Sequence, residues 1–216
     1  MKVPKRKIKI SSVLAAGVLF LNGCAGVGPE KRAFPLALSV DAEEGEYVVI
    51  YAMADLPLMT GQGKDQGESG ESQNTGSVFR GRSFEEIQEQ YDSSQEYMLD
   101  LGHVQALILG DGLLQDEEKR HELFEEIGSS TVISRNLYLF RTEKPELVME
   151  QNGKEKDSVG EFLAGFYENQ PGRTEHKPVT LEDFFYEWSN EGTVPELPRL
   201  VCQEGQIFLE EPESSK

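Results

Sequence analysis

Apolar residues recur along the chain in two patterns, one typical of strands and one typical of helices. Two strand-like runs, Phe34 to Val40 and Glu46 to Ala54, flank the turn-forming segment Asp41 to Gly45, which predicts a β-hairpin. Val104 to Leu109 is almost continuously apolar, as in a strand covered on both faces. Thr131 to Arg141 is the second candidate for an interior strand. Together these runs predict a β-sheet.

Three helix starts are marked by the capping-box pattern. In this pattern a Ser or Thr oxygen accepts from an early backbone N–H, and an acidic residue three positions later reaches back. Apolar residues then recur on one helical face, so we expect amphipathic helices that pack on the sheet. The pairs are Ser83/Glu86, Ser158/Glu161 and Thr180/Asp183, and the apolar faces are Phe84, Ile87, Tyr91 and Met98; Val159, Phe162, Leu163, Phe166 and Tyr167; and Leu181, Phe184, Phe185 and Trp188.

The remaining elements complete the predicted fold class. We expect a crossover helix at Glu117 to Ile127, between the two interior strands. Near the end, Arg199 to Cys202 and Gln206 to Leu209 bracket Glu204-Gly205, which suggests a short hairpin or an extended pair. The order of elements predicts an α/β (α+β) fold with a mixed β-sheet flanked by amphipathic helices, in a single domain.

Residues 1–23 have the features of an export signal. A head with five Lys or Arg and no acidic residue precedes an apolar run from Ile10 to Gly23. This run is shorter than the roughly 20 apolar residues that a membrane-spanning helix needs. We therefore expect this segment to be cleaved.

The cleavage site resembles a bacterial lipobox. Leu21-Asn22-Gly23-Cys24 predicts that Cys24 is the lipidation site, which receives a diacylglycerol and becomes the N-terminal residue. Several acyl chains hold a protein on a bilayer far more firmly than one chain does. The alternative is a plain secretory signal in which Cys24 is incidental.

Charge excludes one class of partner. Without residues 1–23 the chain has 16 Lys and Arg against 39 Asp and Glu, a formal charge of −23. Nucleic-acid binding needs a basic face, so no nucleic-acid partner is expected. The same charge opposes contact with anionic lipid headgroups, so the membrane would hold the protein through the lipid on Cys24.

His103 is the most conspicuous candidate for chemistry, because a Gly-His pair stands directly before the apolar run Val104 to Leu109. A general base needs a nucleophile or an orienting carboxylate within hydrogen-bond reach. No serine or cysteine motif supplies the nucleophile, and Asp100 is only a neighbour in sequence. The structural interpretation is a histidine that ends a turn and hydrogen-bonds the backbone at the entrance of a strand.

Other sites are not indicated. His103, His121 and His176 show no ligand spacing, so no metal site is expected, and no cofactor is expected either. Residues 61–77 contain no large apolar residue and predict a flexible loop. Cys202 would be the one cysteine left after lipidation of Cys24, so no internal disulfide is expected.

The order of motifs resembles the N-terminal domain of the Ger(x)C family, the lipoprotein C subunits of nutrient germinant receptors in endospore-forming bacteria. The lipobox Cys24 comes first. Then follow PEKRAFPLALSVD with EYVVIYAMADLP, GRSFEEIQEQYDSS, LGHVQALILGDGLL, SRNLYLFRTEKPELVM, VGEFLAGFYENQ, and PVTLEDFFYEW with VPELPRL. The Gly-His before a hydrophobic strand is the most specific of these motifs.

The resemblance implies a non-enzymatic protein without catalytic residues. Such a protein would act in spore germination on the outer face of the cell membrane, which is the inner spore membrane. Its partners would be the multi-pass A- and B-type receptor subunits. The one position that carries over with a chemical role is Cys24, the acyl acceptor.

The chain also departs from the family pattern. A Trp-Asp pair typically follows the lipidated cysteine in the family, whereas Ala25 and Gly26 stand here. Family proteins continue through two further domains, whereas this sequence ends at Lys216. The expected layout is a signal peptide at 1–23, a lipidated tether at 24–33, a Ger(x)C N-terminal-like domain at 34–210 and a polar tail at 211–216. The expected role is a receptor subunit or an accessory protein.

A second hypothesis belongs to another functional class. It is a surface lipoprotein that binds a small solute, or acts as a hydrolase, through a pocket near His103 and the 61–77 loop.

Overall fold

A computed structural model describes residues 28–54, 77–154, 156, 158–169 and 177–210. The chain divides into two compact units, residues 1–32 and residues 33–216. Within the first, the described part is a 3-10 turn η1 (Pro29–Lys31) and the first residue of β1 (Arg32–Ala33). The architecture that follows is that of the second unit.

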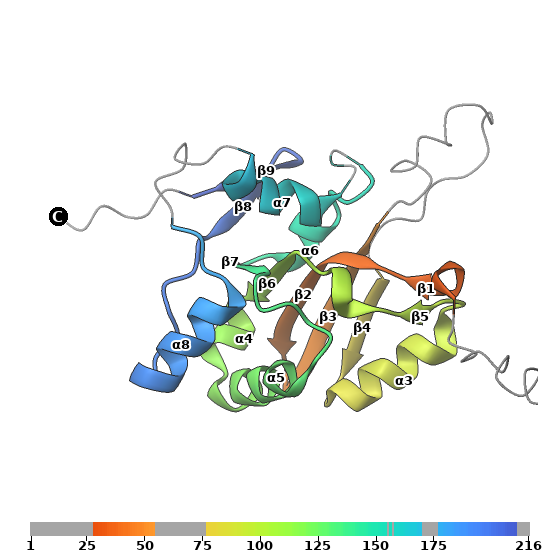
Figure 1. The fold of residues 1–216 in the computed structure, drawn as a ribbon, viewed down its shortest axis with the longest axis horizontal. Helices are drawn as coiled ribbons and strands as arrows, with labels where there is room; N and C mark the ends of the chain where they lie inside the picture. The colour runs from red at the N-terminus through yellow and green to blue at the C-terminus, as the bar shows by residue number, and fades with distance from the viewer. Residues whose placement is uncertain (1–27, 55–76, 155, 157, 170–176, 211–216) are drawn as a thin grey trace, which may run out of the picture. The chain divides into compact units, whose positions relative to one another are not determined.

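The centre of the fold is a five-stranded mixed sheet with the order β4-β3-β2-β6-β7 (Figure 1). β2 pairs antiparallel with β3 and parallel with β6, β3 pairs antiparallel with β4, and β6 pairs parallel with β7. The strands are β2 (Pro35–Glu43), β3 (Glu46–Met53), β4 (Ser77–Gly81), β6 (Ala106–Gly110) and β7 (Tyr138–Thr142). The predicted mixed sheet with flanking helices is confirmed.

Both predicted hairpins close through two-residue turns. Glu44 and Gly45 have φ values of 51° and 83°, and Glu43 pairs with Glu46 across the turn between β2 and β3. Glu204 and Gly205, with φ of 51° and 78°, do the same between β8 (Leu200–Gln203) and β9 (Gln206–Leu209). Positive φ at both central residues matches the twist of the flanking strands, and glycine adopts it without a steric penalty.

One face of the sheet is covered by α3 (Phe84–Ser94), α4 (Asp111–Gln115), α5 (Glu117–Ser129) and α8 (Leu181–Glu191) (Figure 1). The side chains that meet there form a continuous apolar core. Aromatic rings make up much of it, including Phe124 stacked on Phe184 with ring centroids 3.9 Å apart. Tyr51, Phe79 and Tyr91 form a second aromatic group under α3.

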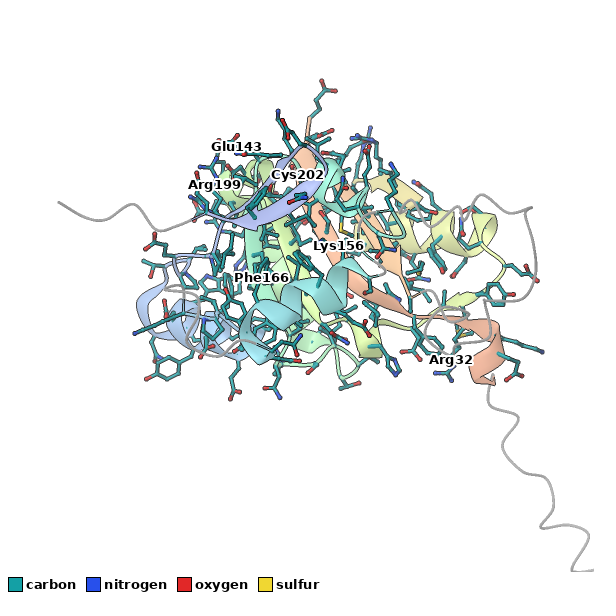
Figure 2. All side chains as sticks on the ribbon, turned by 90° about the horizontal axis from the view of Figure 1, so that it is seen from above. Arg32, Glu143, Lys156, Phe166, Arg199 and Cys202 are labelled. Atoms are coloured by element: carbon teal, nitrogen blue, oxygen red, sulfur yellow. The ribbon has the colours of Figure 1, made fainter. Side chains whose placement is uncertain are left out.

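The opposite face is covered by α6 (Pro145–Met149), α7 (Val159–Glu168) and the β8–β9 hairpin. Figure 2 looks down on this layer, with Phe166 on α7 and Cys202 on β8. Ala37, Ala106 and Ile108 of the sheet pack against Val159 and Leu163 of α7. The central strands are therefore buried on both faces, as their continuous apolar runs predict.

Two segments from late in the chain cover the outer edge of β7. Leu139 N donates to Val179 O at 2.8 Å, and Arg141 N donates to Pro198 O at 2.9 Å. The Arg199 guanidinium forms ion pairs with Glu143 and, at 3.1 Å, with Glu210. Figure 2 shows Arg199 beside Glu143. This edge strand consequently offers no free row of backbone groups along its middle.

The three predicted helix starts are confirmed. The side-chain oxygens of Ser83, Ser158 and Thr180 accept from the backbone N–H three residues later. At α8 the reciprocal bond also forms, since Asp183 Oδ2 accepts from Thr180 N at 2.9 Å. At α3 the acidic residue bonds the residue before the N-cap Ser83, since Glu86 Oε2 accepts from Arg82 N at 2.8 Å.

Several predicted boundaries were wrong. The strand expected at Thr131 to Arg141 is shorter, because 131–137 turns on local bonds in which Ser130 Oγ and Ser134 Oγ accept from backbone N–H groups. The sequence also did not reveal α4, α6 or β4, and β4 begins at Ser77, inside the expected 61–77 loop. The rest of that loop lies outside the described residues.

Two further expectations need correction. Met98 was assigned to the apolar face of the first amphipathic helix, but α3 ends at Ser94 and Met98 lies in β5 (Met98–Leu99), 50% exposed. The expected strand at Val104 to Leu109 begins at Ala106, because the 3-10 turn η3 (Leu101–His103) extends close to that point. The helix expected at Glu117 to Ile127 is confirmed as α5.

The close approach of α7 to β2 can be tested with a pair of glycines. A Cβ on Gly160 would overlap the Leu36 carbonyl, whereas one on Gly128 would meet only Phe185 at 3.5 Å. We expect Gly160→Ala to lower the free energy of unfolding by about 1–3 kcal/mol through overpacking. The control Gly128→Ala should change it by about 1 kcal/mol or less, in the stabilising direction, because alanine favours helix. Urea denaturation measures both, and equal effects would contradict this account of the contact.

Candidate functional site

Asp41 is a buried carboxylate at the carboxyl end of β2 that the sequence did not single out. Its side chain is only 7% exposed. Asp41 Oδ1 accepts from Ala42 N and from Leu113 N, each at 2.8 Å, so it ties the end of β2 to the start of α4. Burial raises the pKa of Asp41, and the two N–H bonds oppose that rise.

Two glycines make room for this carboxylate. A Cβ on Gly110 would overlap the Asp41 carboxyl group, and one on Gly112 would overlap the Ala42 carbonyl. The Gly-Asp-Gly sequence directly after an apolar strand was the signal that could have revealed the contact. Among the described residues no group of three or more His, Cys, Asp or Glu could hold a metal ion. The hydrogen bond from Leu113 N to Asp41 Oδ1 holds the end of β2 against the start of α4.

His103 is the last residue of η3, immediately before the chain enters β6. Its side chain is exposed, and its ring packs edge-on against Phe34 with centroids 4.8 Å apart. Asp100, the one acidic neighbour, instead caps the turn, because its Oδ1 accepts from Gly102 N at 3.0 Å. The structure thus places His103 at the entrance of β6, with its ring against Phe34.

The other candidates are dispersed. His121 lies on α5, where Nε2 is 3.2 Å from Glu125 and the ring meets Trp188 edge-on. Cys202 is a half-buried free cysteine on β8, and burial raises the pKa of its thiol, which disfavours the reactive thiolate. Cys24 and His176 lie outside the described residues.

A groove with a volume of about 750 Å³ lies between α3 and α5. We call it the α3–α5 groove. Figure 1 shows the two helices over the same face of the sheet. The apolar lining comes from the sheet below and from both helices, joined at one end by η3 and the segment after α5: Leu38, Val40, Tyr47, Val49, Tyr51, Phe84, Leu101, Leu123, Ile127 and Ile133. Leu101 comes from the same turn as His103, but His103 does not line the groove.

The rim of the groove is acidic. Glu85, Glu89 and Asp92 line it from α3, and Glu122 and Glu126 line it from α5. Arg82, at the start of α3, is the one basic residue of the lining. An apolar groove with charged rims on two helices can bind a side chain or a peptide.

A polar network around Tyr47 includes two further residues of the groove lining, Arg82 and Glu122. The fully buried Tyr47 hydroxyl lies 2.8 Å from both Glu122 Oε2 and Lys119 O, so these two acceptors share its single hydrogen. Lys119 Nζ donates to Arg82 O at 2.9 Å and lies 4.5 Å from the centroid of the Tyr47 ring. The hydrogen bond from the Tyr47 hydroxyl lowers the pKa of Glu122, and the hydrogen bond from Lys119 lowers it further. Burial raises the pKa of Tyr47.

Comparison with protein families decides the assignment. Residues 28–201 match the family model described as the spore germination protein N-terminal domain. The chain belongs to this family. The match confirms the resemblance to the N-terminal domain of Ger(x)C proteins. No individual curated protein and no solved structure shows a significant match to the chain.

The spore germination domain thus includes nearly all of the described fold. The matched residues contain the sheet, the Asp41 contact and both walls of the α3–α5 groove. The match begins after Cys24, so it carries no information on lipidation. Membership of the family assigns the chain a role in spore germination.

Two substitutions test whether Asp41 acts as a hydrogen-bond acceptor. Asp41→Ala leaves the buried Leu113 N–H without its acceptor, and we expect a loss of about 1–3 kcal/mol of unfolding free energy at pH 7. Asp41→Asn keeps an oxygen that can accept both N–H bonds, so the loss should be smaller. Thermal or urea unfolding measures both variants, and equal losses would show that Oδ1 does not provide the tie.

The pH dependence of Asp41→Asn has a defined sign. The pKa of Asp41 is raised in the folded state, so the stability gained from this group is full below about pH 4, the pKa of an unfolded chain, and is lost as the pH rises through the folded value. Asn does not titrate. The stability of Asp41→Asn relative to wild type should therefore increase between about pH 4 and pH 7, and a decrease over this range would contradict the assignment.

Proposed function

We propose that this protein is a lipid-anchored, non-enzymatic subunit or accessory protein of a nutrient germinant receptor. The observation that carries the proposal is the family match over residues 28–201 together with Leu21-Asn22-Gly23-Cys24 just upstream of it. The family assigns the role in germination, and the tetrapeptide supplies an acyl acceptor close to the first matched residue.

The proposed location is the outer face of the membrane that surrounds the spore core. Within the part of the chain that the structure describes, no helix is long and apolar enough to span a bilayer. Without residues 1–23 the formal charge of −23, from 16 Lys and Arg against 39 Asp and Glu, disfavours binding of the polypeptide surface to anionic headgroups. A diacylglycerol on Cys24, together with further acylation, would supply the membrane affinity.

The proposed partners are the multi-pass A- and B-type receptor subunits. The proposal gives His103 a structural role, because its ring contacts Phe34 at the entrance of β6. The alternative of a pocket near His103 gains no support from the described cavities, because His103 does not line the α3–α5 groove.

Lipidation can be tested with the two cysteines as a matched pair. In sporulating cells fed an alkyne-tagged fatty acid, the wild-type protein and Cys202→Ala should both become labelled, and Cys24→Ala should lose the label. Labelling is the deciding measurement, because an uncleaved signal segment could itself keep Cys24→Ala with the membrane. Equal labelling of Cys24→Ala and wild type would contradict the proposed anchor.

Receptor assembly has its own test. We expect tagged protein, isolated from spores after mild crosslinking, to copurify with multi-pass A- and B-type subunits identified by mass spectrometry. An untagged strain controls for background. Failure to recover any such subunit, with the bait itself abundant, would contradict assembly with a receptor.

A further inference from the structure

The acidic residues of the α3–α5 groove lie in two stripes that face each other. Glu85, Glu89 and Asp92 recur at helical spacing on α3, and Glu122 and Glu126 recur at the same spacing on α5. Of these five, only Glu122 forms an ion pair within the described part of the chain, with Lys119 at 3.3 Å. The remaining four carboxylates border the apolar groove, and none of them has a basic partner among the residues that the structure describes.

The floor between the stripes selects for apolar groups. Tyr47, Val49 and Leu123 are almost fully buried, while Phe84, Leu101 and Ile133 are half-buried and continue the apolar lining toward the surface. A small cation would leave this lining in contact with water. An occupant that carries both apolar and basic side chains satisfies the floor and the rim together.

The shape of the groove favours a helical occupant. α3 has 11 residues, so its wall is about 16 Å long, which matches about three helical turns. The lining consists of helix faces and a sheet face, and it includes no strand edge that could pair with an extended peptide. A helix satisfies its own backbone hydrogen bonds, and its apolar face can enter such a groove with anchors at i, i+3, i+4 and i+7.

A second copy of this chain is a poor match. The described helices of more than eight residues are α3, α5, α7 and α8, and in each the acidic residues outnumber Lys and Arg. Docking one of them would place acidic side chains against the acidic rim, which is unfavourable. None of the described helices fits the rim, which favours a different protein as the occupant.

We propose that the α3–α5 groove is a docking site for a basic amphipathic helix of a partner protein. Apolar side chains of that helix occupy the groove, and its Lys or Arg residues pair with Glu85, Glu89, Asp92 and Glu126. The site does not depend on lipidation of Cys24, so its test and the labelling test can fail independently.

The full-length chain in nanodiscs of zwitterionic lipid is suited to this test. The probe is a fluorescent helical peptide of about 14 residues, with Leu at i, i+3, i+4 and i+7 and Lys at the other positions. Anisotropy reports binding, and empty nanodiscs report binding to lipid alone. We expect saturable binding to the protein, and a peptide with Glu in place of Lys should not bind.

Charge-reversal variants locate the site. Glu89→Lys/Asp92→Lys/Glu126→Lys should weaken binding at least about tenfold, which is about 1.4 kcal/mol. The control Glu118→Lys/Glu125→Lys/Glu196→Lys makes the same change in net charge at exposed positions outside the groove and should stay within about twofold of wild type. Equal weakening by the two triple variants would overturn the proposal, because net charge alone would then explain binding.

A steric pair tests the groove without changing charge. Gln88 lines the groove from α3, whereas Ser93 is exposed on the same helix and outside the lining. Gln88→Trp should fill the groove and weaken binding at least about tenfold, with Ser93→Trp close to wild type. Far-UV circular dichroism tests whether both variants fold. If Gln88→Trp does not fold, the comparison of the two charge-reversal variants decides the outcome.

Other occupants are separate outcomes of the same experiments. A peptide with Lys but no Leu that binds as tightly as the probe would show that the apolar floor is not used, and would overturn the proposal. Self-association of the chain that Gln88→Trp abolishes, measured by analytical ultracentrifugation, would assign the groove to a second copy and would also overturn it. If the Gln88→Trp variant binds the peptide as tightly as the wild-type protein does, the groove is not the binding site.

Discussion

The parallel pairing of β2 with β6 is the constraint on which the rest of the fold depends. β2 is antiparallel to β3 on its other side, so one strand joins a hairpin to the parallel half of the sheet. Parallel strands cannot be joined by a tight turn and need crossover connections. Here α3 precedes β6 and α5 precedes β7, and both cover the same face of the sheet. The groove between these helices is thus a consequence of how the two connections cross the sheet.

Elements with strong local patterns could be predicted from the sequence. The capping residues Ser83, Ser158 and Thr180 act within one helical turn, so the helix starts do not depend on the rest of the fold. β4 could not be predicted, because Ser77 to Gly81 has few apolar residues and acquires strand geometry by pairing with β3. Residues 131–137 were misassigned because serine side chains there bond the backbone and compete with a strand.

The candidate sites also differ in whether local sequence or tertiary structure determines them. The sequence placed His103 at the entrance of a strand, and local position was enough for that. Asp41 and Leu113 are 72 positions apart, so their hydrogen bond depends on the register of β2 against β6. The acidic stripes of α3 and α5 resemble ordinary solvated helix faces when each is considered alone. Only the tertiary structure brings them to opposite sides of one groove.

The covered edge of β7 has a consequence for folding during synthesis. Its backbone partners are Val179 and Pro198, which follow the strand by roughly forty to sixty residues. A nascent chain that has already made the five sheet strands still exposes this edge until the segment around Pro198 has emerged from the ribosome. Until then the unpaired backbone groups at the edge of β7 are open to wrong pairing.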